Sequence, residues 1–290
     1  MENRINGHTK LFCLIGSPVG HSGSPAMYNY SFDKLNMDNA YLAFDVPLEK
    51  TQQAVEALKL LHVGGFNITM PCKTAVSQCV DALSPAAEMI GACNTVTVDA
   101  EGKLTGHNTD GIGFVRNLAK HGVDVKGKKL VVLGAGGAAT ALTIQSALDG
   151  AAQIRIFNRK GFKFYENGQR TVAKISAKIP GCQVSIEDLL DSEALAQAVN
   201  ECDILVNATK VGMAPLDKET LIDAKLFRPG LVVADTVYNP KETRMILEAK
   251  AAGCTVVGGI GMLLQQGVEA FRLFTGEQMP EEEVQQKFFS

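Results

Sequence analysis

Two polar residues in this chain have the types and positions needed for proton transfer. The segment FNITMPCK (66–73) reads as the end of a buried strand that stops at Pro71, and Lys73 follows. Asp110 stands in a second loop, GHNTDG (106–111). Ligands of α/β proteins bind beside the carboxyl ends of strands, so this is a place for chemistry. A nearby acid favours the charged form of a lysine and burial disfavours it, which suits a general acid/base. The competing interpretation is two surface charges, because spacing alone does not bring them together.

A glycine-rich loop predicts a second kind of site. LVVLGAGGAAT (130–140) places Gly134, Gly136 and Gly137 between an apolar strand and a helix that Ala138 and Ala139 open. Glycines permit the tight turn and let backbone N–H groups approach a pyrophosphate at a helix N-terminus. A lone match of this kind is weak, but the strand-to-helix context favours a dinucleotide site over a simple tight turn.

The end of the following strand bears on the choice of cofactor. Sites that prefer NAD carry Asp or Glu about 20 residues after the loop, for the ribose 2′-hydroxyl. Here that region reads Asn158-Arg159-Lys160, with no acid before Glu166. Arg159 can stack on adenine or bind a 2′-phosphate, and its charge-assisted bonds are strong. We therefore expect NADP, with NAD possible. The alternative is that Arg159 and Lys160 are solvated loop cations.

The elements that position these residues alternate between strands and helices. In the first part we predict strands at 11–16, 41–46 and 65–70, with helices from Pro25 to about Leu35 and over 48–61. A hairpin around 100–102 follows, which predicts a mixed sheet. A helix over 111–121 closed by Gly122 comes next.

A second series of strands begins at Lys128. We predict strands at 128–134, 153–159, 202–209, 230–240 and 254–259, separated by helices, which make a doubly wound parallel domain. The tail from Met262 is predicted to be helical. We therefore expect an α/β protein of two domains, one of residues 1–109 plus 262–290 and one of residues 110–261. A single homogeneous domain is the competing interpretation, which the length makes less favourable.

The composition narrows the function classes. The chain has 290 residues, of which 46% are hydrophobic, and a net charge of −3 that argues against nucleic-acid binding. The N-terminal MENRINGHTK lacks the apolar core of a signal peptide, and no apolar stretch is long enough to span a bilayer. Seven scattered cysteines without a CxxC pair, and five histidines without a cluster, predict reduced thiols in a cytoplasmic protein and no metal site. A monomer or a homodimer is expected.

Over nearly its full length the chain resembles the shikimate dehydrogenase family, including its quinate/shikimate branch. The matching motifs include GSPVGHSGSPAMYN, FNITMPCK, GHNTDGIGF, VLGAGGAA, NATKVGM and GIGMLLQQG, in the order of the family. The resemblance implies a catalytic domain, a Rossmann domain, and reversible NADP(H)-dependent reduction of 3-dehydroshikimate to shikimate. A quinate/shikimate dehydrogenase using NAD or NADP is the alternative within the family.

The resemblance also implies roles for individual residues. Lys73 would be the general acid/base, with Asp110 as its partner. Ser22 and Ser24 would bind the substrate carboxylate. The ring hydroxyls would be held by Thr69, Asn94, Asp110 and Gln266, with Tyr238 nearby. The cofactor residues would be Gly134, Ala135, Gly136, Gly137, Ala138, Asn158, Arg159, Lys160, Thr209, Val237 and Gly259.

Ordinary structural roles compete with these assignments. Ser22 and Ser24 lie in a Pro/Gly loop where serine is common turn chemistry, Thr69 suits a strand, and Gln266 suits a helix surface. A rival of another class is a regulator that binds NADP and substrate without turnover. The presence of both Lys73 and Asp110 argues against it, since a binding module needs no proton donor.

Overall fold

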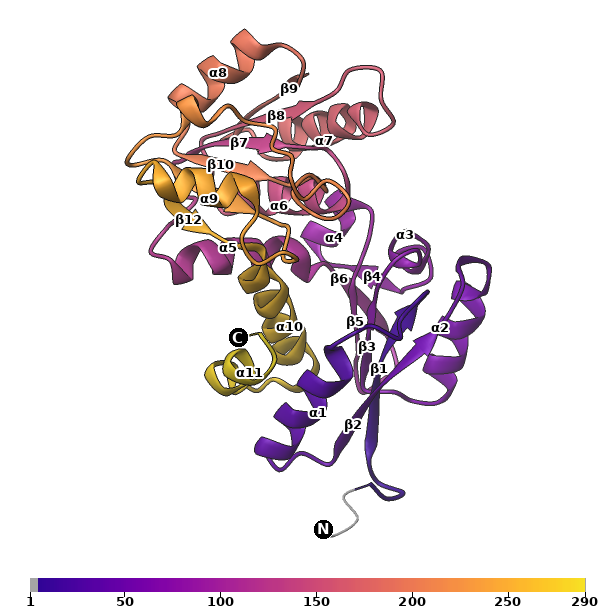
Figure 1. Cartoon of the computed structure of the whole chain (residues 1–290). Coiled ribbons are helices and arrows are strands. Elements are labelled where there is room, and N and C mark those ends of the chain that lie inside the picture. Colours follow the sequence, from indigo (N-terminus) through magenta and orange to yellow (C-terminus); the bar gives the residue numbers. More distant parts are fainter. Residues whose placement is uncertain (1–4, 290) are drawn as a thin grey trace. The chain divides into compact units, whose positions relative to one another are not determined.

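A computed structural model describes residues 5–289. It consists of two compact units, which we call the first unit (residues up to Thr109, and from Gln266 onward) and the second unit (Asp110–Gln265). Each unit has its own six-stranded sheet with helices packed on it (Figure 1). The predicted α/β class, with one mixed sheet and one parallel sheet, is confirmed.

The sheet of the first unit mixes parallel and antiparallel pairs. Its spatial order is β2 (Asn39–Asp45), β1 (Lys10–Gly16), β3 (Gly65–Ile68), β5 (Thr95–Val98), β6 (Leu104–His107) and β4 (Ala82–Leu83). Strand β1 runs parallel to β2 and to β3, whereas β5 runs antiparallel to β3 and to β6. The hairpin predicted around residues 100–102 is the β5–β6 pair, and Gly102 takes a φ of 78° there.

Strand β1 is buried on both faces because helices cover both. Cys13 and Ile15 point to the side of α2 (Thr51–Leu60), whose Val55 and Leu58 join the same core cluster. Phe12, on the opposite face, meets Phe32 of α1 (Ser24–Lys34) and Phe274 of α10 (Gly259–Thr275). Alternation with a period of two residues thus sends successive side chains into two different cores.

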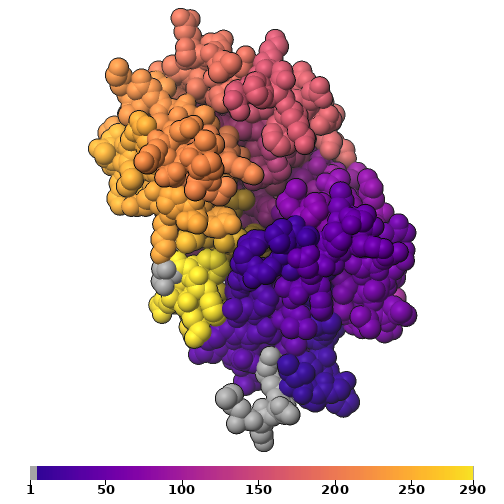
Figure 2. Space-filling model, turned by 45° about the vertical axis from the view of Figure 1, so that its right-hand side comes forward, coloured from indigo at the N-terminus to yellow at the C-terminus, as the bar shows by residue number. Residues whose placement is uncertain are grey.

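The C-terminal helix α11 (Glu281–Phe288) packs on α1 within the first unit. Lys34 and Tyr30 both contact the Glu283 carboxylate, each at 2.6 Å, and the Tyr30 ring meets Phe288 edge-on. Figure 2 shows the yellow C-terminal residues against the indigo N-terminal ones. The amphipathic pattern of residues 280–290 predicts this helix, and its Val284 is fully buried.

The second unit has a parallel sheet in the order of dinucleotide-binding folds. The order is β9 (Gln183–Asp188), β8 (Gln153–Asn158), β7 (Lys129–Leu133), β10 (Ile204–Asn207), β11 (Val232–Asp235) and β12 (Thr255–Val257). All five neighbouring pairs are parallel. The order reverses between β7 and β10, so ligands of such a sheet bind beside the carboxyl ends of these strands. Its helices are α5 (Thr109–Lys120), α6 (Gly137–Leu148), α7 (Tyr165–Lys178), α8 (Ser192–Glu201) and α9 (Arg244–Ala251).

Several short elements were absent from our prediction. Strand β9 is an edge strand whose sequence, QVSIED, has no fully buried residue, so it shows no apolar run. Helices α3 (Lys73–Val76) and α4 (Pro85–Ile90) are too short for a 3.6-residue period to show. The predicted strands at 202–209 and 230–240 end sooner, at Asn207 and Asp235, because loops begin there.

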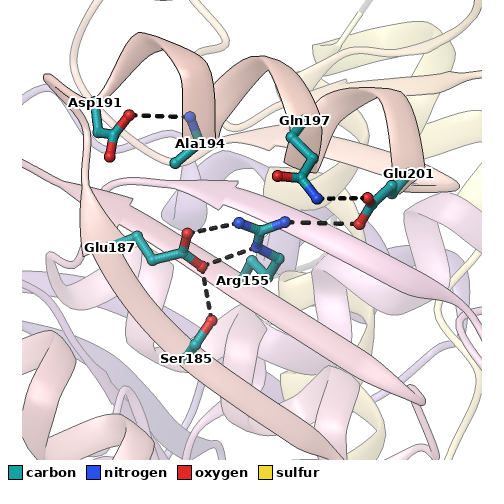
Figure 3. A network of polar contacts seen from close by, with 7 residues as sticks. All are labelled: Arg155, Ser185, Glu187, Asp191, Ala194, Gln197 and Glu201. Carbon is teal, nitrogen blue, oxygen red and sulfur yellow. Dashed lines mark hydrogen bonds and ion pairs between the residues drawn. The ribbon is translucent and has the colours of Figure 1, made fainter.

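An ion-pair network holds β9 on the sheet (Figure 3). The Arg155 guanidinium donates to both oxygens of Glu187 at 2.8 and 2.6 Å, and Ser185 donates to the same carboxylate at 2.9 Å. Glu201 of α8 lies 3.8 Å from Arg155 on the other side. The hydrogen bonds from Arg155 lower the pKa of Glu187. This bidentate pairing anchors a strand that apolar burial holds weakly.

All seven cysteines are free thiols, of which five are buried and two, Cys79 and Cys254, are half-buried. No helix within residues 5–289 has the length and apolar character that a bilayer crossing requires. The same residues contain no cluster of three or more His, Cys, Asp or Glu arranged to hold a metal ion.

Candidate active site

Four strand ends meet at one edge of the first sheet. Strands β1 and β3 are parallel and both end there, and β5, being antiparallel to β3, begins there. Strand β6 runs against β5, so its last residue, His107, returns to the same edge. The loops that carry Ser22 and Ser24, Thr69 and Lys73, and Asn94 therefore all start from this edge.

The loops after β1 and β3 are tied together by backbone bonds. Ser17 N–H donates to the Met70 carbonyl at 3.0 Å, and Thr69 N–H donates to the Ile15 carbonyl at 2.9 Å. Gly16 permits this close approach, because it has a φ of 150° and a Cβ there would come within 2.9 Å of the Met70 carbonyl and clash with the Thr69 methyl. The Lys73 loop thus has a fixed position relative to the serine loop.

Lys73 opens α3 directly after this tie, and its side chain is half-buried. Its own carbonyl accepts the N–H of Cys93 at 3.1 Å, which joins it to the start of β5. Burial raises the pKa of the Cys93 thiol to about 12, although the Lys73 charge acts in the opposite direction. Cys93 is therefore a neutral packing residue beside the lysine.

Asn94 is the centre of a buried hydrogen-bond network. Its side-chain oxygen accepts from Thr109 N–H at 2.8 Å and from the Thr95 hydroxyl at 3.1 Å, and its nitrogen donates to the Thr109 hydroxyl at 3.0 Å. Asn67 of β3 donates to the Asn94 carbonyl and the Thr95 hydroxyl and accepts from Tyr41 at 2.7 Å. Asn94 is only 3% exposed, so these bonds fix the amide against rotation.

Gln266 and the two serines complete the predicted residues of the first unit. The Thr109 hydroxyl lies 3.5 Å from the Gln266 side-chain oxygen, which extends the network to α10. Ser22 uses its hydroxyl to accept the N–H of Ser24 at 3.2 Å, and both residues are half-buried. Asp110, near the start of α5, and Tyr238, in the loop after β11, belong to the second unit.

The glycine loop of the second unit has the backbone that an anion site requires. Gly134 takes a φ of 107°, and a Cβ there would come within 2.9 Å of the Ala208 carbonyl, so glycine is needed. Gly136 and Gly137 have no atom within 4 Å of their Cβ positions, so there is open space beside this turn. Gly136 caps α6 without a side-chain hydrogen bond, so no side chain of the cap residue occupies the first amides of the helix, which suits an anion site.

The end of β8 carries a buried donor without a partner. The side-chain nitrogen of Asn158 is buried and makes no hydrogen bond to the protein. An unpaired buried amide is costly, so this nitrogen is a candidate donor to a ligand. Arg159 is exposed and stacks over the Phe162 ring at 4.3 Å, and Lys160 is exposed beside it. These residues fit an adenosine ribose with a 2′-phosphate.

Two residues in this part of the sheet escaped the sequence analysis. Asn207 ends β10, and its side-chain oxygen accepts from the Thr209 hydroxyl at 2.7 Å and the Thr209 N–H at 3.1 Å. Asp235 ends β11 and accepts from Asn207 at 3.0 Å, Val237 N–H at 2.9 Å and Thr243 at 2.7 Å. Burial raises the pKa of Asp235 to about 6. Both end a strand of the parallel sheet, as Asn158 does, so their position at strand ends could have identified them from the sequence.

The Asn207–Asp235 pair positions the predicted cofactor residues Thr209 and Val237. Gly259, also predicted, lies close to the same loop, because a Cβ there would come within 2.5 Å of the Val237 carbonyl. The loops after β7, β8, β10 and β11 thus all stand at the carboxyl edge of the second sheet. That arrangement suits an extended dinucleotide with its pyrophosphate on α6.

Comparison with known proteins identifies two family matches. Residues 14–96 match the family described as the shikimate dehydrogenase substrate binding domain, and residues 259–287 match the shikimate 5′-dehydrogenase C-terminal domain. A protein of Listeria monocytogenes called shikimate dehydrogenase (NADP(+)) is 46% identical over 290 residues, covering 100% of this chain and 99% of its own. A Streptococcus uberis protein of the same name is also 46% identical, over 293 residues.

Solved structures agree with the sequence matches. Shikimate 5-dehydrogenase from Listeria monocytogenes, in complex with shikimate and NAD, has a TM-score of 0.96 and 45% identity, and covers 99% of this chain and 98% of its own. Quinate dehydrogenase from Corynebacterium glutamicum, in complex with NAD, has a TM-score of 0.86 and 29% identity, with 97% and 99% covered.

Proposed function

Because the chain belongs to the shikimate dehydrogenase family, we propose that it catalyses the reversible NADP(H)-dependent reduction of 3-dehydroshikimate to shikimate. It is an oxidoreductase that acts on a CH–OH group. The proposal rests on the arrangement of side chains and loops at the edge of the first sheet. There, the Lys73 loop is bonded to the serine loop and to the start of β5, among amide and hydroxyl groups.

The substrate is a ring with a carboxylate and several hydroxyls, so it needs convergent donors and acceptors. We assign its carboxylate to the hydroxyls of Ser22 and Ser24. Its ring hydroxyls go to Thr69, Asn94, Asp110 and Gln266, with Tyr238 nearby. The fixed Asn94 amide supports this assignment, because a group held by three hydrogen bonds needs little reordering when it binds a hydroxyl.

Lys73 is the proton donor of the reduction. Bound NADPH supplies a hydride to the carbonyl carbon, which turns the carbonyl oxygen into an alkoxide. The Lys73 ammonium gives this oxygen its proton and becomes a neutral amine, which regains a proton from solvent. In the reverse direction the neutral amine takes the hydroxyl proton as the hydride leaves. We assign Asp110 as the partner of this lysine, because a carboxylate beside an ammonium favours its charged form.

The cofactor is held by the second unit. The pyrophosphate lies on the amides of Gly136 and Gly137, and Ala135 and Ala138 line the turn. The unpaired Asn158 amide and the Arg159 guanidinium bind the adenosine ribose and its 2′-phosphate, next to Lys160. The other end of the dinucleotide is lined by Thr209, Val237 and Gly259.

A quinate/shikimate dehydrogenase is the second candidate, favoured by the quinate dehydrogenase among the similar structures. An assay of shikimate and quinate, each with NADP and with NAD, separates the two by nicotinamide absorbance. Turnover of shikimate with NADP alone supports the first function. Comparable turnover of quinate supports the second. If no pair of substrate and cofactor turns over while NADP still binds, the chain is the non-catalytic regulator.

We also propose a cytoplasmic location, which the seven free thiols support, since a reducing compartment keeps cysteines unpaired. The predicted partners are this small-molecule substrate and the cofactor, and the state in solution is a monomer or a homodimer. Light scattering of the purified chain distinguishes a single chain of 31.0 kDa from a pair.

A further inference from the structure

We propose that Asp188 is a specificity-determining residue of the cofactor site, where its carboxylate opposes the cations that select a 2′-phosphate. The inference rests on the proposed NADP-binding function. The sequence around Arg159 contains no acid before Glu166, which predicts a site with cations alone. The sheet changes this, because β9 brings a carboxylate to the same loop.

The register of the sheet places Asp188 beside the cofactor residues. Strands β8 and β9 are parallel, and Asn158 is the partner of Asp188 at their common carboxyl end. The Asp188 carboxylate accepts the N–H of Lys160 at 3.2 Å, which is the peptide that joins Arg159 to Lys160. It also accepts the N–H of Leu190 at 3.1 Å.

Asp188 therefore has two separable effects on the loop. Its oxygen caps the loop backbone and so fixes the direction in which Arg159 leaves the strand. The second effect comes from its charge. A carboxylate bonded to the peptide after Arg159 repels the dianionic 2′-phosphate of NADP but not the 2′-hydroxyl of NAD. Removal of the charge with the cap retained should favour NADP, whereas removal of the cap should weaken both cofactors.

The similar proteins are consistent with such a balance. One Listeria monocytogenes relative carries NADP(+) in its name, while a Listeria monocytogenes structure with a TM-score of 0.96 contains NAD. A site that places an acid next to the peptide of a cation accommodates both the 2′-phosphorylated ribose of NADP and the ribose of NAD. A site with cations alone has no feature that lowers its preference for the phosphate.

The test measures binding of two adenosine fragments to the full chain by calorimetry. The fragments are 2′,5′-ADP and 5′-AMP, which differ only in the 2′-phosphate, and selectivity is the ratio of their dissociation constants. Asp188→Asn retains an oxygen that can accept the two N–H groups and removes the charge. Asp188→Ala removes both. Asp223→Asn is the matched control, since the exposed Asp223 likewise caps a backbone N–H, that of Lys225, at 3.0 Å.

We expect Asp188→Asn to raise selectivity for 2′,5′-ADP about threefold or more, in line with exposed charge interactions, and Asp223→Asn to leave it unchanged. Asp188→Ala should weaken both fragments. Unchanged or lower selectivity in Asp188→Asn overturns the inference. If that variant does not fold, Asp188→Ser provides a second uncharged side chain with an acceptor oxygen, and the same criteria apply. If neither fragment binds the unmodified chain, the proposed NADP function fails, and this inference fails with it.

Discussion

The Asn94 side chain and Thr109 are joined through both the backbone and the side chain of the threonine. The Asn94 oxygen accepts the Thr109 N–H at 2.8 Å, and the Asn94 nitrogen donates to the Thr109 hydroxyl at 3.0 Å. Thr109 begins α5, so this amide links the start of β5 to the start of a helix. Asn94, which we propose binds the substrate, is thus also part of the hydrogen-bond framework that joins these two elements.

Asn94→Ala should therefore lower stability as well as substrate affinity. The substitution leaves the buried Thr109 N–H without its acceptor, which costs roughly 1–3 kcal/mol in the free energy of unfolding. Urea unfolding and the KM for shikimate are the two measurements. Thr109→Val, which keeps the backbone bond, should cost less. Asn200→Ala, on the exposed face of α8, is the control. An unfolding midpoint for Asn94→Ala equal to that of the control would contradict the framework role.

Lys73→Ala should remove most turnover and affect substrate binding less. Loss of a general acid lowers kcat by about a hundredfold to ten-thousandfold. Steady-state kinetics measures kcat, and protection by shikimate against thermal unfolding measures binding. Lys59→Ala is the control, because Lys59 is an exposed lysine of the same unit that pairs with Asp81 at 3.2 Å. Turnover in Lys73→Ala equal to that in Lys59→Ala would refute the assignment.

Arg159→Ala should reduce the preference for NADP over NAD, measured as the ratio of kcat/KM for the two cofactors. Charge-assisted bonds to a phosphate are lost with NADP and not with NAD, so kcat/KM should fall roughly tenfold to a hundredfold for NADP alone. Arg170→Ala, an exposed arginine of α7, should leave the ratio unchanged. Equal losses with both cofactors would show that Arg159 does not bind the 2′-phosphate.

Gly16→Ala should disturb the tie between the serine loop and the lysine loop. The residue has a φ of 150°, and its Cβ would come within 2.9 Å of the Met70 carbonyl, so the two loops must separate. We expect a loss of at least about 1 kcal/mol in stability and a raised KM for shikimate. Gly20→Ala is a close control in the same loop, with no atom within 4 Å of its Cβ position. Similar behaviour of both variants would argue against the tie.

Asp235 should produce a pH dependence of stability between about pH 4 and pH 6. Burial raises its folded pKa from 3.8 to about 6, so the folded state binds the proton more tightly than the unfolded chain. The contribution of this group is therefore fully present below pH 4 and is lost as the pH rises through 6. Its size is on the order of 3 kcal/mol, from the difference between the two pKa values.

Urea unfolding of the wild type and of Asp235→Asn at several pH values measures this term. The difference in unfolding free energy between the two proteins should change between pH 4 and pH 6 and be constant above 7. Asp217→Asn, in an exposed loop, should show no such change relative to the wild type. A constant difference for Asp235→Asn across the whole range would mean that Asp235 has the same pKa in the folded and unfolded chains.

The sequence predicted the larger elements because their signals are local. The apolar runs of β7 and β10, the proline at the start of α1 and the hairpin turn at Gly102 all depend on a few neighbouring residues. Strand β9 could not be predicted in this way. Its place depends on pairing with β8 and on the ion pair between Glu187 and Arg155, which is distant in sequence.

The same distinction between local and distant signals applies to the candidate site. Motifs supplied Lys73, Asn94 and Arg159, but not the bonds that hold them, since these join separate strands. Asp188 is the clearest case, because only the register of two parallel strands brings it to the Arg159 loop.

The distribution of thiols offers a way to test whether the two units move relative to one another. Five of the seven cysteines are buried, and the two half-buried ones, Cys79 and Cys254, lie one in each unit. The native chain therefore carries one partly exposed thiol per unit, and labelling can be attempted there without an engineered cysteine. A donor and an acceptor dye attached there would report the distance between the units by energy transfer. Titration with shikimate and NADP would then show directly whether ligands draw the units together.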